Sequence, residues 1–327
     1  MRWMKPVAMG VVVLLSAATF VRAAVLDGKR VPEDAKWLLH VDMDALRESK
    51  TWKTLLQGEL EKNPGFQTTV QNVQVFTGFR FPQDLHDVTL YGKAFNEEAG
   101  VVVIHATVDS SVLLGQLALA PGYETFRHGD HDVHSWQDKG KQLYGSFQST
   151  SVAVIGRSRE NVQKAIDVLD GKAAGMKMGW GVTEGAKGTV LAYVGGSGLA
   201  ELRQMQRVKT PLLNEAEMAW VSVGEQEGSL VLRAAVGTKT ARAAEQMKAL
   251  ADGMKAMVAL AAANENADAK AKAASAAMES LSTKVQEKTV SAELRVQLDT
   301  LRKLISLGGA KGGGDAEAPK AAEGGAK

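Results

Sequence analysis

Two stretches of the chain share one order of features: VTLYGKAFNEEAGVVVIHATVDSSVLLGQL at residues 88–117 and AWVSVGEQEGSLVLRAAVGTKTARAAEQM at residues 219–247. Each is typical of an apolar strand, a polar link, a second apolar strand and a capped helix. Strand–helix pairs at residues 36–60 and 189–205 precede them in the same order. We therefore predict an α+β fold in which a duplicated unit of antiparallel sheet carries helices packed on one face.

Changes in composition predict where the two units begin and end. Residues 171–188 are rich in glycine, lysine and small side chains, which favours a linker at 173–188. Residues 308–327 lack the apolar side chains needed for a core, so we expect a disordered C-terminal tail there. The two α+β units are then expected at residues 24–172 and 189–307.

The N-terminus has the features of a cleavable signal peptide. Arg2 and Lys5 give it a basic start, and residues 7–19 form an apolar run without a charge. This run is shorter than the roughly 20 residues of a membrane-spanning helix. We expect cleavage after Ala23 to remove residues 1–23, leaving no stable membrane span; the alternative is a retained anchor. The mature protein is expected to be exported, periplasmic or secreted.

Cysteine and charge content narrow the possible functions. The chain has no cysteine, which excludes disulfides, thiolate metal sites and thiol nucleophiles. Without the three basic residues of the signal peptide, 36 basic and 37 acidic side chains remain of the 39 and 37 in the whole chain. This balance gives no electrostatic reason to expect nucleic acid as a partner.

We expect the partner to be an envelope protein or a small ligand. We expect no cofactor, and the sequence leaves the oligomeric state open.

The densest group of potential metal ligands is HGDHDVH at residues 128–134. Imidazole and carboxylate side chains suit a divalent cation such as zinc when three or four of them converge. On an extended strand, four of these side chains would share one face: His128, Asp130, Asp132 and His134. Convergence on one ion would need a turn at Gly129. The competing interpretation, which we favour, is a polar hairpin tip.

Two other polar segments have simple structural interpretations. His40, Asp42 and Asp44 alternate and could form an acid–base or metal site, but capping of the following helix by an aspartate is favoured. The glycine-rich segment 195–198 lies between an expected strand and helix. Its spacing fits neither a dinucleotide-binding loop nor a nucleophile elbow, so we predict a tight turn.

The helix expected after Thr238 or Thr240 carries side chains at alternating three- and four-residue steps, namely Met247, Leu250, Met254, Met257 and Ala261. This spacing is typical of a packing seam, so we interpret the methionine stripe as core. A further alanine- and lysine-rich helix is expected to run to Val285. A third hypothesis is a membrane-associated scaffold that uses residues 241–285 against a partner, which an exposed apolar groove beside these methionines would support.

Three segments carry a family resemblance: PEDAKWLLHVDMDALRES at 32–49, TGFRFPQDLHDVTLYGKAF at 77–95 and, less strongly, HDVHSWQDKG at 131–140. They resemble a group of uncharacterised exported bacterial proteins common in planctomycetes. Arg80 stands where many of these relatives have aspartate. The resemblance covers the first half of the chain. It implies an envelope location in a two-membrane bacterium and brings no known activity or catalytic residues.

Together these patterns predict an exported cell-envelope protein with a non-enzymatic binding or structural role. The alternative is a metal-dependent envelope enzyme that uses His128, Asp130, Asp132 and His134.

Overall fold

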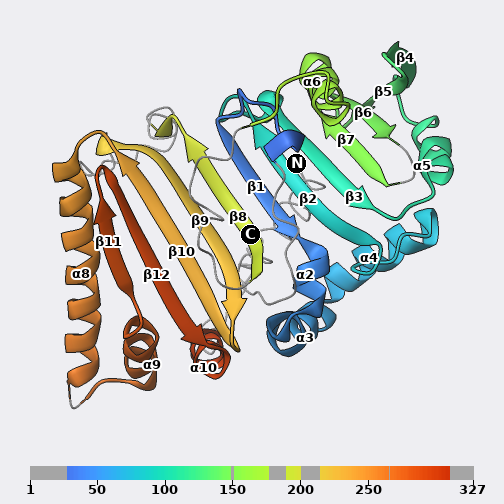
Figure 1. Cartoon of the computed structure of the whole chain (residues 1–327). Coiled ribbons are helices and arrows are strands. Elements are labelled where there is room, and N and C mark those ends of the chain that lie inside the picture. The colour runs from blue at the N-terminus through green and yellow to red at the C-terminus, as the bar shows by residue number, and fades with distance from the viewer. Residues whose placement is uncertain (1–27, 149–150, 177–188, 200–213, 265, 310–327) are drawn as a thin grey trace, which may run out of the picture.

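The computed structural model describes residues 28–148, 151–176, 189–199, 214–264 and 266–309. Within these ranges the chain forms one twelve-stranded sheet in which every neighbouring pair is antiparallel, as Figure 1 shows. The strand order is β11-β12-β10-β9-β8-β1-β2-β3-β7-β6-β5-β4. The predicted α+β class with a large antiparallel sheet is therefore confirmed.

The strands have the following bounds: β1 Trp37–Asp42, β2 Leu85–Gly92, β3 Gly100–Ala106, β4 Glu124–His128, β5 His131–Asp138, β6 Lys141–Gln148, β7 Val152–Gly156, β8 Thr189–Ser197, β9 Ala216–Gln226, β10 Ser229–Thr238, β11 Ser282–Gln286 and β12 Thr289–Gln297. The helices are α2 Met43–Glu48, α3 Gln57–Glu61, α4 Pro64–Thr77, α5 Ser110–Leu117, α6 Arg159–Leu169, α8 Ala241–Ala263, α9 Ala269–Met278 and α10 Leu298–Gly309. Short helical turns are η1 Gly28–Arg30, η2 Trp52–Leu56 and η3 Glu97–Ala99.

The first and second halves of the chain meet at the antiparallel pair β1 and β8, which runs from Trp37 opposite Gly196 to Val41 opposite Ala192. Outward from this pair the order is β1, β2, β3, β7, β6, β5, β4 on one side and β8, β9, β10, β12, β11 on the other. On each side the strands that follow the first three return beside the third: the four strands β4 to β7 place β7 beside β3, and the β11–β12 hairpin places β12 beside β10. Strands from before and after the predicted linker therefore share one sheet; residues 177–188 of that linker lie outside the described residues.

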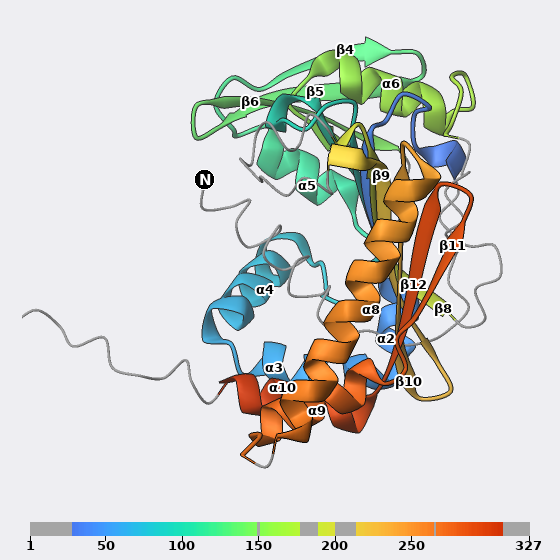
Figure 2. The same ribbon diagram turned by 90° about the vertical axis from the view of Figure 1, so that its left-hand side faces the viewer.

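Helices cover both faces of the sheet. Residues that pair directly across neighbouring strands share a face of the sheet. One such row runs across six strands and consists of Leu39, Val194, Val221, Ala234, Ala292 and Thr283. We call this side the α8 face, because Thr283 Oγ1 donates a hydrogen bond of 2.6 Å to Asp252 of α8. Figure 2 shows α3, α4, α8, α9 and α10 on one side of strands β10 to β12.

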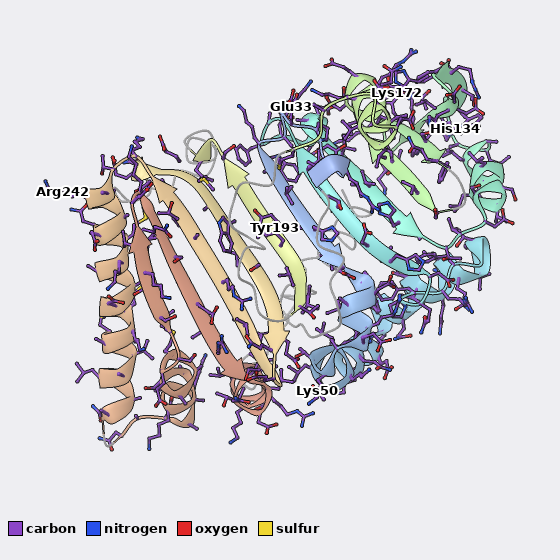
Figure 3. The ribbon with its side chains drawn as sticks, in the orientation of Figure 1. Glu33, Lys50, His134, Lys172, Tyr193 and Arg242 are labelled. Carbon is purple, nitrogen blue, oxygen red and sulfur yellow. The ribbon has the colours of Figure 1, made fainter. Side chains whose placement is uncertain are left out.

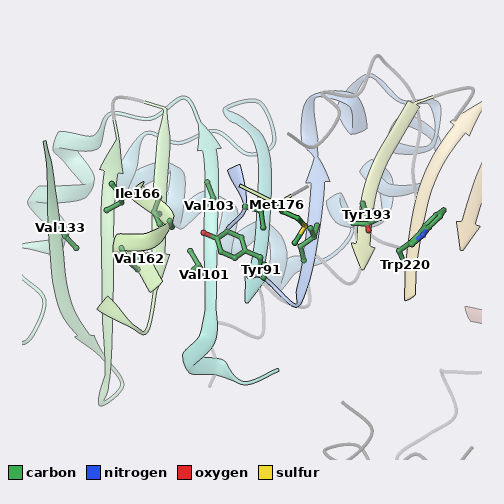
Figure 4. Close-up of a cluster of buried hydrophobic side chains, with 14 of the residues drawn as sticks. Tyr91, Val101, Val103, Val133, Val162, Ile166, Met176, Tyr193 and Trp220 are labelled. Atoms are coloured by element: carbon green, nitrogen blue, oxygen red, sulfur yellow. The ribbon is translucent and has the colours of Figure 1, made fainter. Parts of the chain in front are cut away.

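Helix α6 lies on the opposite side, which we call the α6 face. Its Val162 and Ile166 belong to the largest buried cluster, together with Val101 and Val103 of β3 (Figure 4). We expected all helices to pack on one face of the sheet. Helices α2 and α8 do share one face, but α6 lies on the other. The physical reason is the run Val101–Ile104, which gives β3 an apolar side chain on both faces.

Several helices begin at a side chain that caps their first turn, as predicted for an aspartate before α2 and a threonine before α8. The side chains of Asp42, Asp109, Ser158 and Thr240 accept hydrogen bonds from the first turns of α2, α5, α6 and α8. The helix predicted to run to Val285 is wrong beyond Met278. Residues 282–286 instead form β11, because their alternating side chains pair with β12 across a turn in which Glu287 adopts a φ of 53°.

The two chain ends fall outside the described residues, so the predicted signal peptide at 1–23 and almost all of the predicted tail at 308–327 are not placed. Among the helices of the described ranges, none combines the length and apolarity needed to cross a membrane.

Candidate functional site

The predicted metal ligands lie on the β4–β5 hairpin, and the hairpin separates them. Gly129 has a φ of 57°, and the turn it makes places His128 opposite His131. Nε2 of His128 lies 2.8 Å from Oδ1 of Asp167, on helix α6. Nε2 of His131 lies 2.9 Å from Oδ1 of Asp170, one helical turn further along. These two histidine–aspartate pairs attach the hairpin to α6.

The other three predicted ligands face elsewhere. His134 stacks on Tyr123 at a ring distance of 5.8 Å, and burial lowers the pKa of this imidazole. Asp132 pairs with Arg127 at 3.1 Å, while the Asp130 side chain is 93% exposed. Figure 3 shows His134 at the hairpin end of the sheet, near Lys172. Across the described ranges, no three histidine or carboxylate side chains are placed to share a metal ion.

Asp167 and Asp170 are partners of the hairpin histidines that sequence reasoning missed. Their three-residue spacing on α6 was the available signal, because it places two carboxylates on one helix face. Only the fold reveals that this face meets the hairpin.

The alternating residues at 40–44 do not form one site. Asp42 Oδ1 accepts a hydrogen bond of 2.8 Å from the backbone N–H of Ala45, which confirms the predicted cap. His40 Nδ1 lies 2.9 Å from Thr89 Oγ1 on β2. The strand ends at Asp42, so Asp44 lies on α2 and contacts His86 at 3.1 Å.

A polar cluster on the α6 face was not predicted. His105 Nδ1 lies 2.7 Å from Asp87 Oδ1, and Arg30 Nη1 lies 3.3 Å from His105 Nε2. A guanidinium can only donate, so Nε2 accepts, and the ring proton sits on Nδ1 facing Asp87. This is the tautomer of a general base, but the lone pair that would take a proton is occupied by Arg30. The arrangement is a hydrogen-bonded ion-pair network.

His40 lies beside this network and is nearly fully buried, with 7% of the residue exposed. Burial lowers the pKa of His40 to about 4, against the raising effect of Asp87. Its Nε2 has no hydrogen-bond partner within the described structure. His40 therefore stays neutral at physiological pH and acts as a core residue with one unpaired nitrogen.

The glycine-rich segment 195–198 forms the end of β8 and the residue directly after it. A Cβ on Gly196 would lie 3.2 Å from the carbonyl oxygen of Lys36, so glycine permits the close approach of β1. Gly198, directly after the strand, has a φ of 68°. The prediction of a tight turn is wrong for residues 195–197, which pair with β9 as the end of β8; only Gly198 lies outside the strand.

Of the exposed large apolar side chains in the described residues, four lie on helix α8, more than on any other element. Four large side chains of this helix are 53–75% exposed, and we call them the apolar stripe: Leu250, Met254, Met257 and Leu260. The predicted core position of the methionine stripe is therefore wrong. The side of α8 that faces the sheet uses smaller residues such as the buried Ala244 and the half-buried Ala251 and Val258. The large side chains of the apolar stripe lie on the adjacent side of the helix and are exposed to solvent.

The charges near the stripe are engaged within the chain. Lys248 pairs with Asp252 at 2.6 Å. Lys255 Nζ donates hydrogen bonds of 2.8 Å to the carbonyl oxygens of Glu279 and Leu281. Residues 256–263 contain no charged side chain. The helix thus presents a neutral apolar surface for its last two turns.

Known proteins offer only a distant likeness to this chain. No family model matches the chain, and no curated protein matches it. Crystal forms III, I and IV of TP0453 show 9%, 11% and 7% sequence identity, with TM-scores of 0.46, 0.43 and 0.47. The alignments cover 87%, 87% and 85% of this chain and 99%, 98% and 95% of those chains. A likeness at this level says nothing about function.

Proposed function

We propose that this chain is an exported, non-enzymatic protein of the cell envelope that holds a partner α-helix against the apolar stripe of α8. The signal-peptide pattern of residues 1–23 supports export, and the resemblance of the first half supports an envelope location. The single observation that carries the binding role is the exposure of Leu250, Met254, Met257 and Leu260. Large exposed apolar patches on a folded protein mark interaction sites.

The spacing of the side chains favours a helix as the partner. Met247, Leu250, Met254, Met257 and Ala261 recur at steps of three, four, three and four residues. A second helix can insert its side chains between knobs at this spacing, as in a coiled coil. Methionine side chains are flexible and polarizable, so they adapt to a partner's shape. The backbone of α8 is satisfied within the helix, which leaves recognition to side chains.

A bilayer surface fits less well than a helix. Helices that lie on membranes carry lysine and arginine on their polar face and aromatic residues on their apolar face. Here Lys248 and Lys255 are engaged by groups of the chain itself. The apolar stripe contains no aromatic side chain. If the chain acts as a scaffold through this helix, its partner is therefore a protein helix and not lipid.

The return of β7 beside β3 and of β12 beside β10 supports the predicted duplication, although seven strands lie on one side and five on the other. Helix α5 follows β3 and has 8 residues, whereas α8 follows β10, the corresponding strand, and has 23 residues. We infer that the second unit extended this helix. The extra turns carry Met254, Met257 and Leu260, so the extension and the apolar stripe coincide.

Photo-crosslinking in intact cells tests the proposal. A photoreactive residue placed at Met257 should cross-link, and mass spectrometry should map the product to a helix with its own apolar heptad spacing. The same residue at Glu245, which is exposed on α8 outside the apolar stripe, is the matched control and should give no such product. Leu250→Glu in the Met257 background should abolish the cross-link.

Three results would contradict the proposal. The first is equal cross-linking from positions 257 and 245. The second is flotation of the purified mature protein with anionic vesicles that Leu250→Glu abolishes, because it would make a bilayer the partner. The third is a product that maps to a partner loop or strand.

A further inference from the structure

Helix α8 lies at the outer border of the molecule, where a second protein can reach it. Figure 1 shows the helix beyond β11, and β11 is the last strand of the sheet on this side. Figure 2 looks from that border and shows α8 lengthwise. The helix has 23 residues and is therefore about 35 Å long. A helix of this length offers several turns of contact to a second helix.

Exposed apolar side chains are placed symmetrically along α8. Leu250, Met254, Met257 and Ala261 follow one another at steps of four, three and four residues, and all four are exposed. This series of steps is the same when it is read from either end. A two-fold axis between Met254 and Met257 therefore places Leu250 opposite Ala261 of a second copy. The large leucine then meets the smallest side chain of the series, and the flexible methionines meet each other.

The exposure of the helix determines where this axis passes. The exposed fraction rises from 53% at Leu250 to 75% at Leu260, whereas Met247, one step before Leu250, is half-buried. The exposed segment is thus centred between Met254 and Met257. An axis one step earlier would set Met257 against the half-buried Met247. An axis one step later would leave Leu250 beyond the end of the other helix.

The charges of α8 favour the antiparallel orientation that this axis requires. In an antiparallel pair, the charged half of one helix lies beside the uncharged residues 256–263 of the other copy. In a parallel pair each charged side chain would lie beside its own counterpart, and like charges placed side by side are unfavourable. The charged side chains of α8 all precede Ala256 and are Arg242, Glu245, Lys248, Asp252 and Lys255.

From these observations we propose that the partner helix is α8 of a second copy of this chain, bound antiparallel across a two-fold axis between Met254 and Met257. This inference rests on the proposed function, because it names the partner of the apolar stripe. The two copies use the same surface, so both apolar stripes are covered at once and neither is left open to a third copy.

Disulfide trapping tests this pairing, because the chain has no cysteine of its own. Leu250→Cys and Ala261→Cys are prepared as separate mature proteins with tags of different mass. Under mild oxidation the mixture should form a disulfide between the two variants, because facing positions meet the usual Cα separation of about 4.4–6.8 Å. Neither variant should form a disulfide with itself, because positions 250 and 261 lie about 16 Å apart along the helix.

Ala259→Cys provides the matched control for this experiment. Ala259 is exposed on α8, as Ala261 is, but it lies on the side of the helix away from the apolar stripe. Mixed with Leu250→Cys, this variant should give several-fold less disulfide than Ala261→Cys gives.

Sedimentation of the mature protein without added cysteines measures the same dimer. A contact made by one helix is at the small end of protein interfaces, so the protein should be monomeric in dilute solution. Its average mass should double as the concentration rises through the micromolar range. Leu250→Glu should remain monomeric throughout, because it places a charge opposite the apolar stripe of the other copy.

Three results overturn the inference. The first is a disulfide that Leu250→Cys forms with itself as readily as with Ala261→Cys, which indicates a parallel pair. The second is equal trapping of Ala259→Cys. The third is a monomeric mass at every concentration without the mixed disulfide. In that case a Met257 cross-link to a helix of another protein in cells leaves the proposed function standing, whereas the absence of any cross-link removes both.

Discussion

Thr51 Oγ1 lies 3.5 Å from Glu225 Oε2, and this contact joins two positions 174 residues apart in the chain. Glu225 is 1% exposed, and its other carboxyl oxygen has no hydrogen-bond partner within the described structure. It lies at the end of β9, where the turn after α2 packs against the second half of the sheet. Figure 3 labels Lys50, next to Thr51, at this junction.

Glu225 should make stability depend on pH. Burial raises the pKa of this carboxyl from 4.5 to about 7, against the lowering effect of Lys50. The folded state therefore holds a proton that the unfolded state releases, and this contribution is lost as the pH rises from about 4.5 to about 7. Glu225→Gln should raise the free energy of unfolding at pH 8 by about 2 kcal/mol and leave it little changed at pH 4.5. Urea unfolding measures both; equal effects at the two pH values would contradict the assignment.

His40 should make the free energy of unfolding depend on pH in the opposite direction. Burial lowers its pKa from 6.5 to about 4, so the unfolded state takes up a proton first as the pH falls. Stability from this group is present above pH 6.5 and is lost between about 6.5 and 4. The His40 ring signals should not titrate between pH 5.5 and 8 by NMR, whereas a midpoint near 6.5 would show that the ring is solvated.

Two glycine substitutions should have opposite effects. A Cβ on Gly224 would overlap the carbonyl oxygen of Thr189 beside the irregular register of β8, so Gly224→Ala should lower the free energy of unfolding by roughly 1–3 kcal/mol. Gly253 lies on α8, and a Cβ there would meet no atom within 4 Å, so Gly253→Ala should raise it by about 0.5–1 kcal/mol. Chemical denaturation of both variants checks the signs, and a stabilising Gly224→Ala would contradict the strand contact.

The hairpin histidines should not retain zinc. His128, His134 and Asp132 each face a different partner, so convergence on one ion would require breaking the pairs with Asp167, Tyr123 and Arg127. Metal analysis of the purified mature protein should find no stoichiometric zinc, and His134→Ala should not alter its metal content. Stoichiometric zinc that is lost in His134→Ala would instead support the metal-dependent enzyme.

Local patterns predicted much of the fold because they report backbone preferences that tertiary packing did not change. The caps at Asp42 and Thr240 are examples. The hairpin tip at Gly129 was predicted for the same reason: its turn chemistry is local.

The remaining features depend on which surfaces meet. The methionine spacing of α8 predicts a helix-packing seam, but it does not predict which side of the helix faces the sheet. In the structure the side with the alanines faces the sheet. Residues 282–286 form strand β11 and not the predicted helix, because they pair with β12. The Asp87–His105–Arg30 network combines residues from three separate segments, so no local pattern could reveal it.

Oxidation of the methionines by hydrogen peroxide tests the binding role of α8 most directly. Met254 and Met257 are 55% and 71% exposed, so both should oxidise quickly in the purified mature protein. In intact cells a bound helix should slow both several-fold, while the half-buried Met278 on α9, outside the apolar stripe, should oxidise at the same rate in both settings. Equal rates for Met254 and Met257 in cells and in the purified protein would contradict the account.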